Sequence, residues 1–364
     1  MKLTVKTGNH ALIACPVRFT SDNQILDNNF ALVNNSDIMP VQYVGQTGDG
    51  KHEYVFIVRN LDEGINAEFE VIESKALLFG TAKSVVTDKS VDITLDGGEY
   101  TSYYFGTDIP KPYLGPFYGK KGELITRHNY TGKEHPHHRS IWFSHGDING
   151  TDTWNEPQGT HGYIINKEIC DIANGYVYTQ FTAKNLWTHH DKSPIADDTT
   201  TVILYNTPKS RRIIDVSITL TANYGEITLG STKEAGPVAI RMADDYIVPN
   251  GGTIESSFGG VNEKEIWMQR AHWNDYYGAS EYGNVYGAAI FDNPQNIGYP
   301  TYFHTRNYGL MAPNNFHLGG AVVIPAGESL TYKYRFVIHS GDTKKAKIAK
   351  LFNNYISKPE VILN

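Results

Sequence analysis

The chain lacks long apolar runs. Its apolar stretches fall far short of the about 18 residues that a membrane-spanning helix needs, so the sequence predicts no such helix. The first fifteen residues, MKLTVKTGNHALIAC, also lack the apolar centre of a signal peptide. We therefore expect a cytoplasmic protein, with a periplasmic one as the alternative if an export signal has been removed.

Cysteine is scarce and positive charge is dispersed. Only Cys15 and Cys170 occur, far apart, so neither a disulfide scaffold nor a cysteine metal site is predicted. The formal net charge is −7 and no run of Lys and Arg is present. We expect neither nucleic acid nor a membrane as a partner. The motifs Gly-x-Ser-x-Gly and His-Glu-x-x-His are absent, which argues against a serine-hydrolase elbow and a zincin.

Strand-forming residues separated by Gly and Asn turns dominate the chain, and they predict a mostly β protein. Residues 1–75 form a β-rich segment or small sandwich in this interpretation. Residues 76–340 form a large antiparallel β-sandwich that carries the site. Residues 341–364 form a helix, N-capped by Asp342, and a tail. Strands beyond residue 76 are expected at 91–95, 100–105, 137–144, 176–183, 200–205, 212–220, 225–230, 237–243, 285–291, 320–324 and 330–338.

Histidines are concentrated between residues 135 and 154. An extended chain from 135 to 145 would place His135, His137, Arg139 and His145 on one face. His138 and Trp142 would point the other way, and turns would follow near Asp147 and Asn149. Histidine titrates near physiological pH, so this density beside Arg and Asp predicts a functional site.

A second stretch, residues 300–316, alternates Tyr302, His304, Arg306 and Tyr308 along one face. Tyrosine rings stack on sugars, and arginine pairs bidentately with a carboxylate, so this face is typical of a sugar-binding wall. Elsewhere, Glu234 is a candidate acid, base or ligand, although an internal ion pair would explain it equally well.

These stretches supply two sets of predicted site residues. The predicted catalytic residues are His135, His137, His138, Arg139, His145, Glu234, Tyr302, His304 and Arg306. The predicted substrate-binding residues are Arg127, Trp142, Asp147, Asn149, Arg241, Asp275, Tyr277 and Tyr308. For Asp275 and Tyr277, a turn with packed aromatic rings is the alternative. The sequence favours no cofactor. A divalent metal ion held by His135, His137 and His145 is the alternative, although Arg139 on the same face would repel it.

Four segments resemble a bacterial family of unknown function that is commonly labelled "methane oxygenase PmoA". They are KPYLGPFYG from Lys111, HPHHRSIWFSHGDING from His135, TKEAG from Thr232 and YPTYFHTRNYGL from Tyr299. The label implies a membrane copper enzyme, which the missing membrane helix contradicts. The genes of family members look to be neighbours of sugar-utilisation genes, so the resemblance implies carbohydrate chemistry. The strand pattern also resembles the large sandwich of galactose-mutarotase-like proteins.

The leading hypothesis is a carbohydrate lyase or dehydratase acting on a uronic-acid or oxidised sugar. It uses a His or Tyr acid–base pair and an Arg clamp on the developing anion. The alternatives are a mutarotase or epimerase using His304 and Glu234, a glycoside hydrolase with two carboxylates, and a non-catalytic carbohydrate-binding protein. The expected partner is a small-molecule or oligosaccharide substrate, and the sequence does not predict the oligomeric state.

Overall fold

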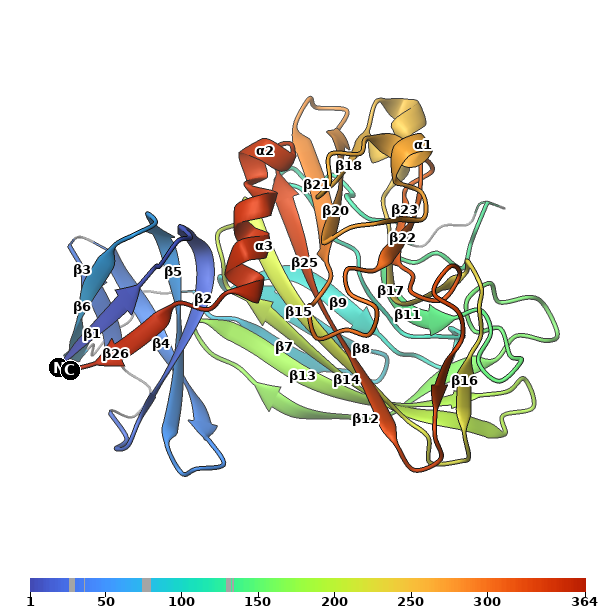
Figure 1. Ribbon diagram of the computed structural model, residues 1–364, viewed down its shortest axis with the longest axis horizontal. Coiled ribbons are helices and arrows are strands. Elements are labelled where there is room, and N and C mark those ends of the chain that lie inside the picture. Colours follow the sequence, from blue (N-terminus) through green and yellow to red (C-terminus); the bar gives the residue numbers. More distant parts are fainter. Residues whose placement is uncertain (26–29, 36, 74–79, 129–131, 133) are drawn as a thin grey trace.

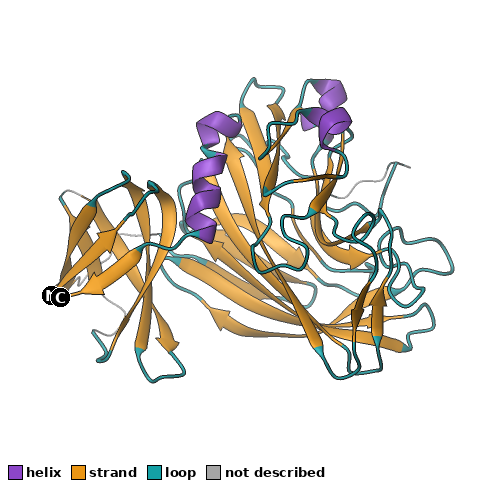
Figure 2. Cartoon of the chain, in the orientation of Figure 1, coloured by secondary structure: helices purple, strands orange, loops and turns teal. Residues whose placement is uncertain are grey.

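The molecule consists of a small β lobe beside a two-sheet sandwich (Figures 1 and 2). The computed structural model describes residues 1–25, 30–35, 37–73, 80–128, 132 and 134–364. The mostly β prediction is confirmed. The boundary expected between residues 75 and 76 lies outside the described residues.

The small lobe is a seven-stranded sheet in the order β2-β5-β4-β3-β6-β1-β26. Its strands are β1 (Lys2–Lys6), β2 (Leu12–Ser21), β3 (Phe30–Asn34), β4 (Asp37–Gln46), β5 (His52–Leu61), β6 (Asn66–Glu73) and β26 (Glu360–Leu363). Leu3 pairs with Leu363, so the two chain ends lie side by side (Figure 1). The tail expected after the last helix therefore forms a strand of the first lobe.

One sheet of the sandwich has nine strands in the order β19-β22-β23-β17-β11-β10-β9-β8-β7. Its strands are β7 (Lys83–Val86), β8 (Ser90–Leu95), β9 (Gly98–Tyr104), β10 (Tyr113–Gly115), β11 (Ile141–His145), β17 (Ala235–Arg241), β19 (Gln269–Arg270), β22 (Tyr302–Arg306) and β23 (Leu310–Pro313). Their pairings are antiparallel.

The other sheet has eight strands in the order β12-β13-β14-β15-β25-β21-β20-β18. Its strands are β12 (Tyr163–Ala173), β13 (Tyr178–Thr188), β14 (Pro194–Tyr205), β15 (Arg211–Thr221), β18 (Thr253–Ser256), β20 (Trp273–Ala279), β21 (Val285–Phe291) and β25 (Ser329–Ser340). A separate pair joins β16 (Ile227–Leu229) to β24 (Val322–Ile324). Asp275 and Tyr277, for which a turn was the alternative prediction, thus lie in strand β20.

The main core lies between the two large sheets. Leu114, Ile141 and Ile240 of adjacent strands point inward and belong to it. Their neighbours Trp142 and Ala239 point outward and belong to a second apolar cluster. Strand residues alternate between the two faces, so the outer face of the nine-stranded sheet is also covered. Loops from other parts of the chain cover it.

The helices are short and lie outside the sandwich core. The predicted C-terminal helix is confirmed but broken into α2 (Thr343–Ala346) and α3 (Ile348–Ile356), because Lys347 between them has a φ of 60°. Asp342 caps it by accepting from the Lys345 N–H. Its apolar face packs on the outer side of the eight-stranded sheet and on strand β2 of the small lobe (Figure 1). The remaining helices are α1 (Asn262–Ile266), η1 (Asp244–Tyr246) and η2 (Val248–Asn250). No helix among the described residues is long and apolar enough to cross a membrane.

A buried ion pair beneath helix α3 gives a stability prediction. Arg335, 1% exposed, donates to both carboxylate oxygens of Asp215 on the neighbouring strand at 2.6 and 2.7 Å. Replacing Asp215 by Ala leaves a buried, unpaired guanidinium and should lower the free energy of unfolding by about 3–5 kcal/mol in urea titrations. The double variant Asp215→Leu with Arg335→Met should recover most of that loss. A single variant as stable as the wild type would contradict the prediction.

Candidate active site

The histidine-rich loop folds over the outer face of the nine-stranded sheet. Strand β11 begins at Ile141, four residues later than the expected start at 137. The chain before it turns, with positive φ at His135 and Ser140 and a hydrogen bond from the His138 N–H to the His135 carbonyl. The predicted alternation from 135 to 140 is therefore wrong, because a turn does not alternate side chains as a strand does.

A stack of rings joins this loop to the sheet. Trp142, fully buried, forms its base. His138 stacks on Trp142 with ring centres 4.9 Å apart, His135 stacks on His138 at 4.7 Å, and Tyr308 stacks on His135 at 4.9 Å. Two predicted stretches, around 135–145 and 300–308, thus meet on one sheet face. Burial, followed by the charges of His137 and Arg241, holds the pKa of His138 well below its usual value.

Two arginines and two carboxylates hold the loop in place. Glu134 accepts from Arg127 at 3.0 Å and from Arg241 at 2.8 Å, and Arg127 also donates to Asp244 at 3.0 Å. Burial raises the pKa of Glu134, but its hydrogen bond with His135, the charge of Arg241 and its hydrogen bond with Arg127 outweigh burial and lower it to about 2. Arg127 and Arg241 therefore lie at the site already paired with carboxylates.

A second ion-pair group lies beside His137. Arg139 donates to both oxygens of Glu156 at 2.6 and 2.9 Å, and the buried Lys111 ammonium donates to the same carboxylate at 2.7 Å. Burial lowers the pKa of Lys111 to about 8, although Glu156 opposes this shift. His137 has a buried Nε2 with no hydrogen-bond partner among the described residues. Burial and the Lys111 charge lower its pKa to about 3, so His137 is neutral at pH 7.

Strand β22 supplies further groups without partners among the residues that the structure describes. His304 donates from Nδ1 to the Lys233 carbonyl at 2.6 Å, because a carbonyl oxygen can only accept. Its Nε2 is therefore an unprotonated acceptor, and it has no partner among the described residues. Burial lowers the pKa of His304 to about 4, even though the hydrogen bond to Lys233 opposes this. His304 is thus a neutral imidazole held in one tautomer at pH 7.

Arg306 lies two residues further along the same face of β22. Its Nε is 2.8 Å from the Glu263 carboxylate. Its two terminal nitrogens have no hydrogen-bond partner among the described residues, and its side chain is 30% exposed. A planar guanidinium with both terminal nitrogens unoccupied is suited to bind an anion through two parallel hydrogen bonds.

Other side chains already contact the tyrosine rings of the expected sugar-binding wall. The Arg270 guanidinium lies 4.1 Å from the Tyr302 ring centre, and Tyr308 contacts both His135 and the Arg241 guanidinium, the latter at 4.6 Å. Neighbouring side chains thus already occupy ring faces that we expected to stack on a sugar. Glu234 is close by, where its charge acts on Tyr308. It accepts from Thr232 at 3.4 Å and pairs with Lys233 at 3.3 Å.

Several predicted site residues lie elsewhere. His145 points into the sandwich core, where its ring meets Phe316 at 4.6 Å. Asp147 and Asn149 form a turn that holds strand β16, with Asn149 bonded to the backbone of Glu226 and Thr228. These positions are set by turn geometry, and the structure does not bring them to the ring stack.

Asp275 and Tyr277 are also separated from the ring stack, because β20 belongs to the eight-stranded sheet. Asp275 is fully buried and pairs with His339 at 2.8 Å while accepting from Thr343 at 2.7 Å. Tyr277 donates to Glu255 at 2.6 Å. Both residues tie structural elements together on the other sheet.

The alternative metal site is not formed. His145 points to the opposite side of the sheet from the loop that carries His135 and His137. Within the part of the chain that the structure describes, no group of three His, Cys, Asp or Glu side chains is arranged to hold a metal ion. The predicted His135, His137 and His145 triad is therefore wrong as a geometric arrangement.

Five charged residues at this site were not predicted from the sequence. They are Lys111, Glu134, Glu156, Asp244 and Glu263. Lys111 begins the KPYLGPFYG segment and Glu134 directly precedes His135, so both were adjacent to highlighted motifs. Glu156, Asp244 and Glu263 gave no local signal, because their arginine partners come from other segments of the chain.

Three buried histidines predict a pH-dependent stability. Burial lowers the pKa values of His137 and His145 to about 3 and of His304 to about 4, from an ordinary value of 6.5. Between pH 6.5 and about 4 the unfolded chain binds protons that the folded chain does not, so the free energy of unfolding falls as the pH falls.

The measurement is the thermal midpoint at pH 7 and pH 5. His145→Asn should reduce the drop between the two values, whereas His10→Asn on the small lobe serves as the control and should keep the wild-type drop. An unchanged drop in His145→Asn would show that its burial does not contribute.

Comparisons with known proteins give one family and distant structural likenesses. A glycosyl hydrolase family 38 protein from Enterococcus faecalis superposes with a TM-score of 0.48 and 10% identity over 99% of this chain and 47% of that one. An alpha-mannosidase from Enterococcus faecalis V583 gives the same TM-score and identity, over 99% of this chain and 45% of that one. This chain spans about half the length of those proteins, and likenesses this distant do not bear on activity.

No curated protein matches the chain, and none of these matches carries the methane oxygenase label. The sequence profile of a family of unknown function, DUF6807, matches residues 90–353. That span covers the ring stack and both sheets of the sandwich except strand β7, and the chain belongs to this family.

Proposed function

We propose that the protein is a carbohydrate-active lyase or dehydratase. His304 removes a proton from the carbon next to a carboxylate or ketone of a sugar, and Arg306 binds the oxygen on which negative charge develops. Such a proton is only weakly acidic, so its removal requires that the developing enolate be stabilised. The leaving oxygen then departs from the neighbouring carbon, giving an unsaturated sugar.

The unoccupied acceptor on His304, beside the unoccupied donors of Arg306, is the observation that carries this proposal. The two residues are separated by one position on a strand, so their Cα atoms are about 7 Å apart and their side chains share a face. The His304 Nε2 is itself buried, so a substrate group reaches both residues only when the side chains that cover this nitrogen move aside. The tautomer of His304 is fixed by the Lys233 carbonyl, so its free nitrogen is a base at pH 7.

Tyr308 is the candidate acid for the departing oxygen. Burial raises the pKa of its phenol, with the charges of Arg306 and Arg241 opposing, so the hydroxyl is protonated at neutral pH and can donate. Its ring centre is 5.4 Å from the Arg306 guanidinium. The carboxylates that a glycosidase would use fit less well, since Glu134, Glu156 and Glu263 are each paired with arginine.

A panel of sugars tests the reaction class. Purified protein is incubated with uronic-acid oligosaccharides, oxidised sugars and neutral sugars, and products are followed by mass and ultraviolet absorbance. Elimination gives loss of water, or scission without water, together with a conjugated ultraviolet band. Gain of water would indicate a glycosidase and overturn the proposal, as would a complete lack of products.

An epimerase or mutarotase is the second candidate, and one observation favours it. The Lys233 carbonyl accepts the hydrogen bond that fixes the tautomer of His304, and Glu234 directly follows Lys233. A carboxyl group therefore lies near a neutral imidazole. In deuterium oxide, an epimerase that inverts a carbon centre exchanges the hydrogen on that carbon for deuterium. Apart from this exchange, its product has the same mass as the substrate. A mutarotase speeds the interconversion of anomers and incorporates none at carbon.

A further inference from the structure

A cavity of about 760 Å³ lies at the other end of strand β9 from the ring stack. Gly98, Glu99 and Tyr100 at the start of β9 line it, whereas Tyr104 at the end of β9 stacks on Tyr113 under the histidine-rich loop. Tyr104 lies five residues beyond Glu99, which corresponds to about 16 Å of extended chain. The cavity is therefore separate from the site proposed above.

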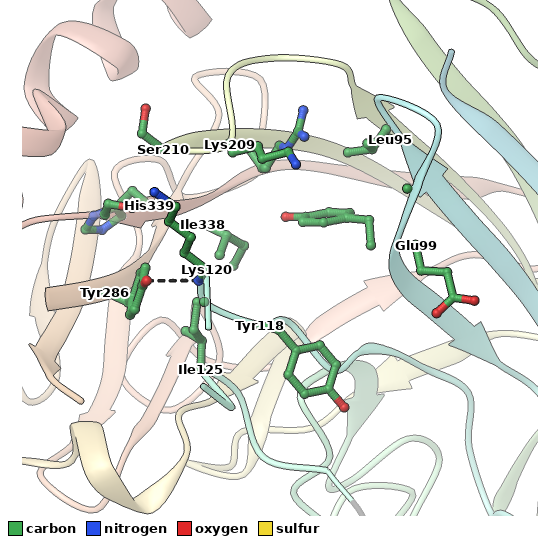
Figure 3. A pocket seen from close by; sticks show the side chains of 15 residues that line it. Leu95, Glu99, Tyr118, Lys120, Ile125, Lys209, Ser210, Tyr286, Ile338 and His339 are labelled. Atoms are coloured by element: carbon green, nitrogen blue, oxygen red, sulfur yellow. Dashed lines mark hydrogen bonds between the residues drawn. The ribbon is translucent and has the colours of Figure 1, made fainter. Parts of the chain in front are cut away.

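The walls of this cavity combine apolar and aromatic side chains (Figure 3). Leu95, Ile125 and Ile338 contribute aliphatic surface, and Tyr100, Tyr118 and Tyr286 contribute rings. In Figure 3, Lys209 and Ser210 lie across the cavity from Tyr118 and Ile125. A volume of this size is in the range that accommodates a small organic ligand.

Some hydrogen-bonding groups of the walls are already used, whereas the buried Tyr100 hydroxyl has no partner among the described residues. The Tyr286 hydroxyl accepts from the Lys120 N–H at 2.9 Å (Figure 3). His339 is engaged by Asp275 and by the Gly341 carbonyl. A neutral sugar would need partners for many hydroxyl groups. The lining therefore favours a ligand with an apolar body over a second sugar.

Positive charge is in excess at the rim. Lys120 and Lys209 are exposed, and neither ammonium has a hydrogen-bond or ion-pair partner among the described residues. Arg212 is neutralised by Asp96 at 2.8 Å, which leaves Glu99 as the opposing charge in the lining. This excess contrasts with the net charge of −7 of the whole chain.

One further carboxylate lies near the rim. Glu123, next to Gly119, is buried and accepts from Asn284 at 2.8 Å and from the Lys121 N–H at 2.7 Å. Its oxygens are thus held by neutral donors, and it does not pair with either rim lysine.

We propose that this cavity binds a small organic anion with a planar apolar body, such as an aromatic carboxylate or sulfonate. The rings and aliphatic side chains remove the apolar body from water, and Lys120 and Lys209 pair with the anionic group. The assignment is independent of the reaction proposed for His304 and Arg306.

A matched pair of fluorescent probes tests the proposal. The anion 1-anilinonaphthalene-8-sulfonate and its uncharged analogue N-phenyl-1-naphthylamine share the same rings and differ in the sulfonate. We expect saturable one-to-one binding of the anion, about tenfold tighter than that of the neutral probe, because two rim cations are available. Equal affinities, or binding that does not saturate, would overturn the proposal.

Two double variants of lysines locate the anionic group. The double variant Lys120→Ala with Lys209→Ala should bind the anionic probe about tenfold more weakly and bind the neutral probe as the wild type does. The control Lys264→Ala with Lys333→Ala, on exposed lysines outside the cavity, should weaken neither.

Gly98→Phe should block both probes, because a Cβ at Gly98 meets no heavy atom nearer than the Leu95 carbonyl oxygen at 3.8 Å and the ring can enter the cavity. Full binding to Gly98→Phe, or no effect of the rim lysines, would place the probe elsewhere and overturn the proposal. His304→Ala should bind as the wild type does, which separates this result from the outcome for the proposed reaction.

Discussion

Replacing Arg306 by Ala is expected to lower turnover by about two to four powers of ten, because it removes the main contact to the developing anion. The loss should appear in kcat, since the enolate charge is present in the transition state and not in the substrate. Arg306→Lys should recover only part of the rate, because an ammonium cannot make two parallel hydrogen bonds to one anion. Steady-state kinetics on the substrate that the sugar panel identifies provide the measurement.

The fold should survive this change. Helix α1 is held to the strand end independently of Arg306, by the Asn307 N–H to Glu263 at 2.8 Å and the Glu263 N–H to Asn307 at 3.1 Å. The thermal midpoint should therefore stay close to that of the wild type. Arg59→Ala, on the small lobe, is the matched control and should keep full activity. Full turnover by Arg306→Ala would remove Arg306 from the mechanism.

Replacing His304 by Ala is expected to lower turnover by about two to four powers of ten through lost proton transfer. The backbone should tolerate the change, because the Lys233 carbonyl that accepts from His304 also accepts from Asn314 at 2.8 Å. His10→Ala is the matched control and should retain the wild-type rate. A His304→Ala variant that turns over normally would show that another group takes the proton.

The pH profile separates a base from a merely structural histidine. A base must be unprotonated to act, and burial lowers the pKa of His304 to about 4. The acidic limb of kcat/KM in the wild type should therefore lie near pH 4, well below the ordinary histidine value of 6.5. His304→Ala should lose this limb in its residual activity. A wild-type limb near pH 6.5 would be inconsistent with His304 as the base.

Much of the fold follows from patterns that are local in the sequence. The alternation of Ile141 and Phe143 with Trp142 assigned the two faces of β11 correctly, because successive strand residues point to opposite faces whatever lies beyond them. The same rule placed His304 and Arg306 on one face of β22. The C-terminal helix was predicted from its cap and apolar spacing, although the break at Lys347 was not.

Tertiary structure decided which of the candidate residues come together. The sequence predicts Arg306 as a catalytic residue and Asp275 as a substrate-binding residue. Asp275 is paired with a histidine 64 residues away inside the other sheet, while two nitrogens of Arg306 have no partner in the described part of the chain. The loop from His135 to Ser140 turns where an extended strand was expected, and its rings stack on Trp142 and Tyr308. The sequence by itself determined the strand periodicity and the residue types available for chemistry. The partners of each charged group, and hence which groups remain unoccupied, depend on contacts between distant segments that no local pattern contains.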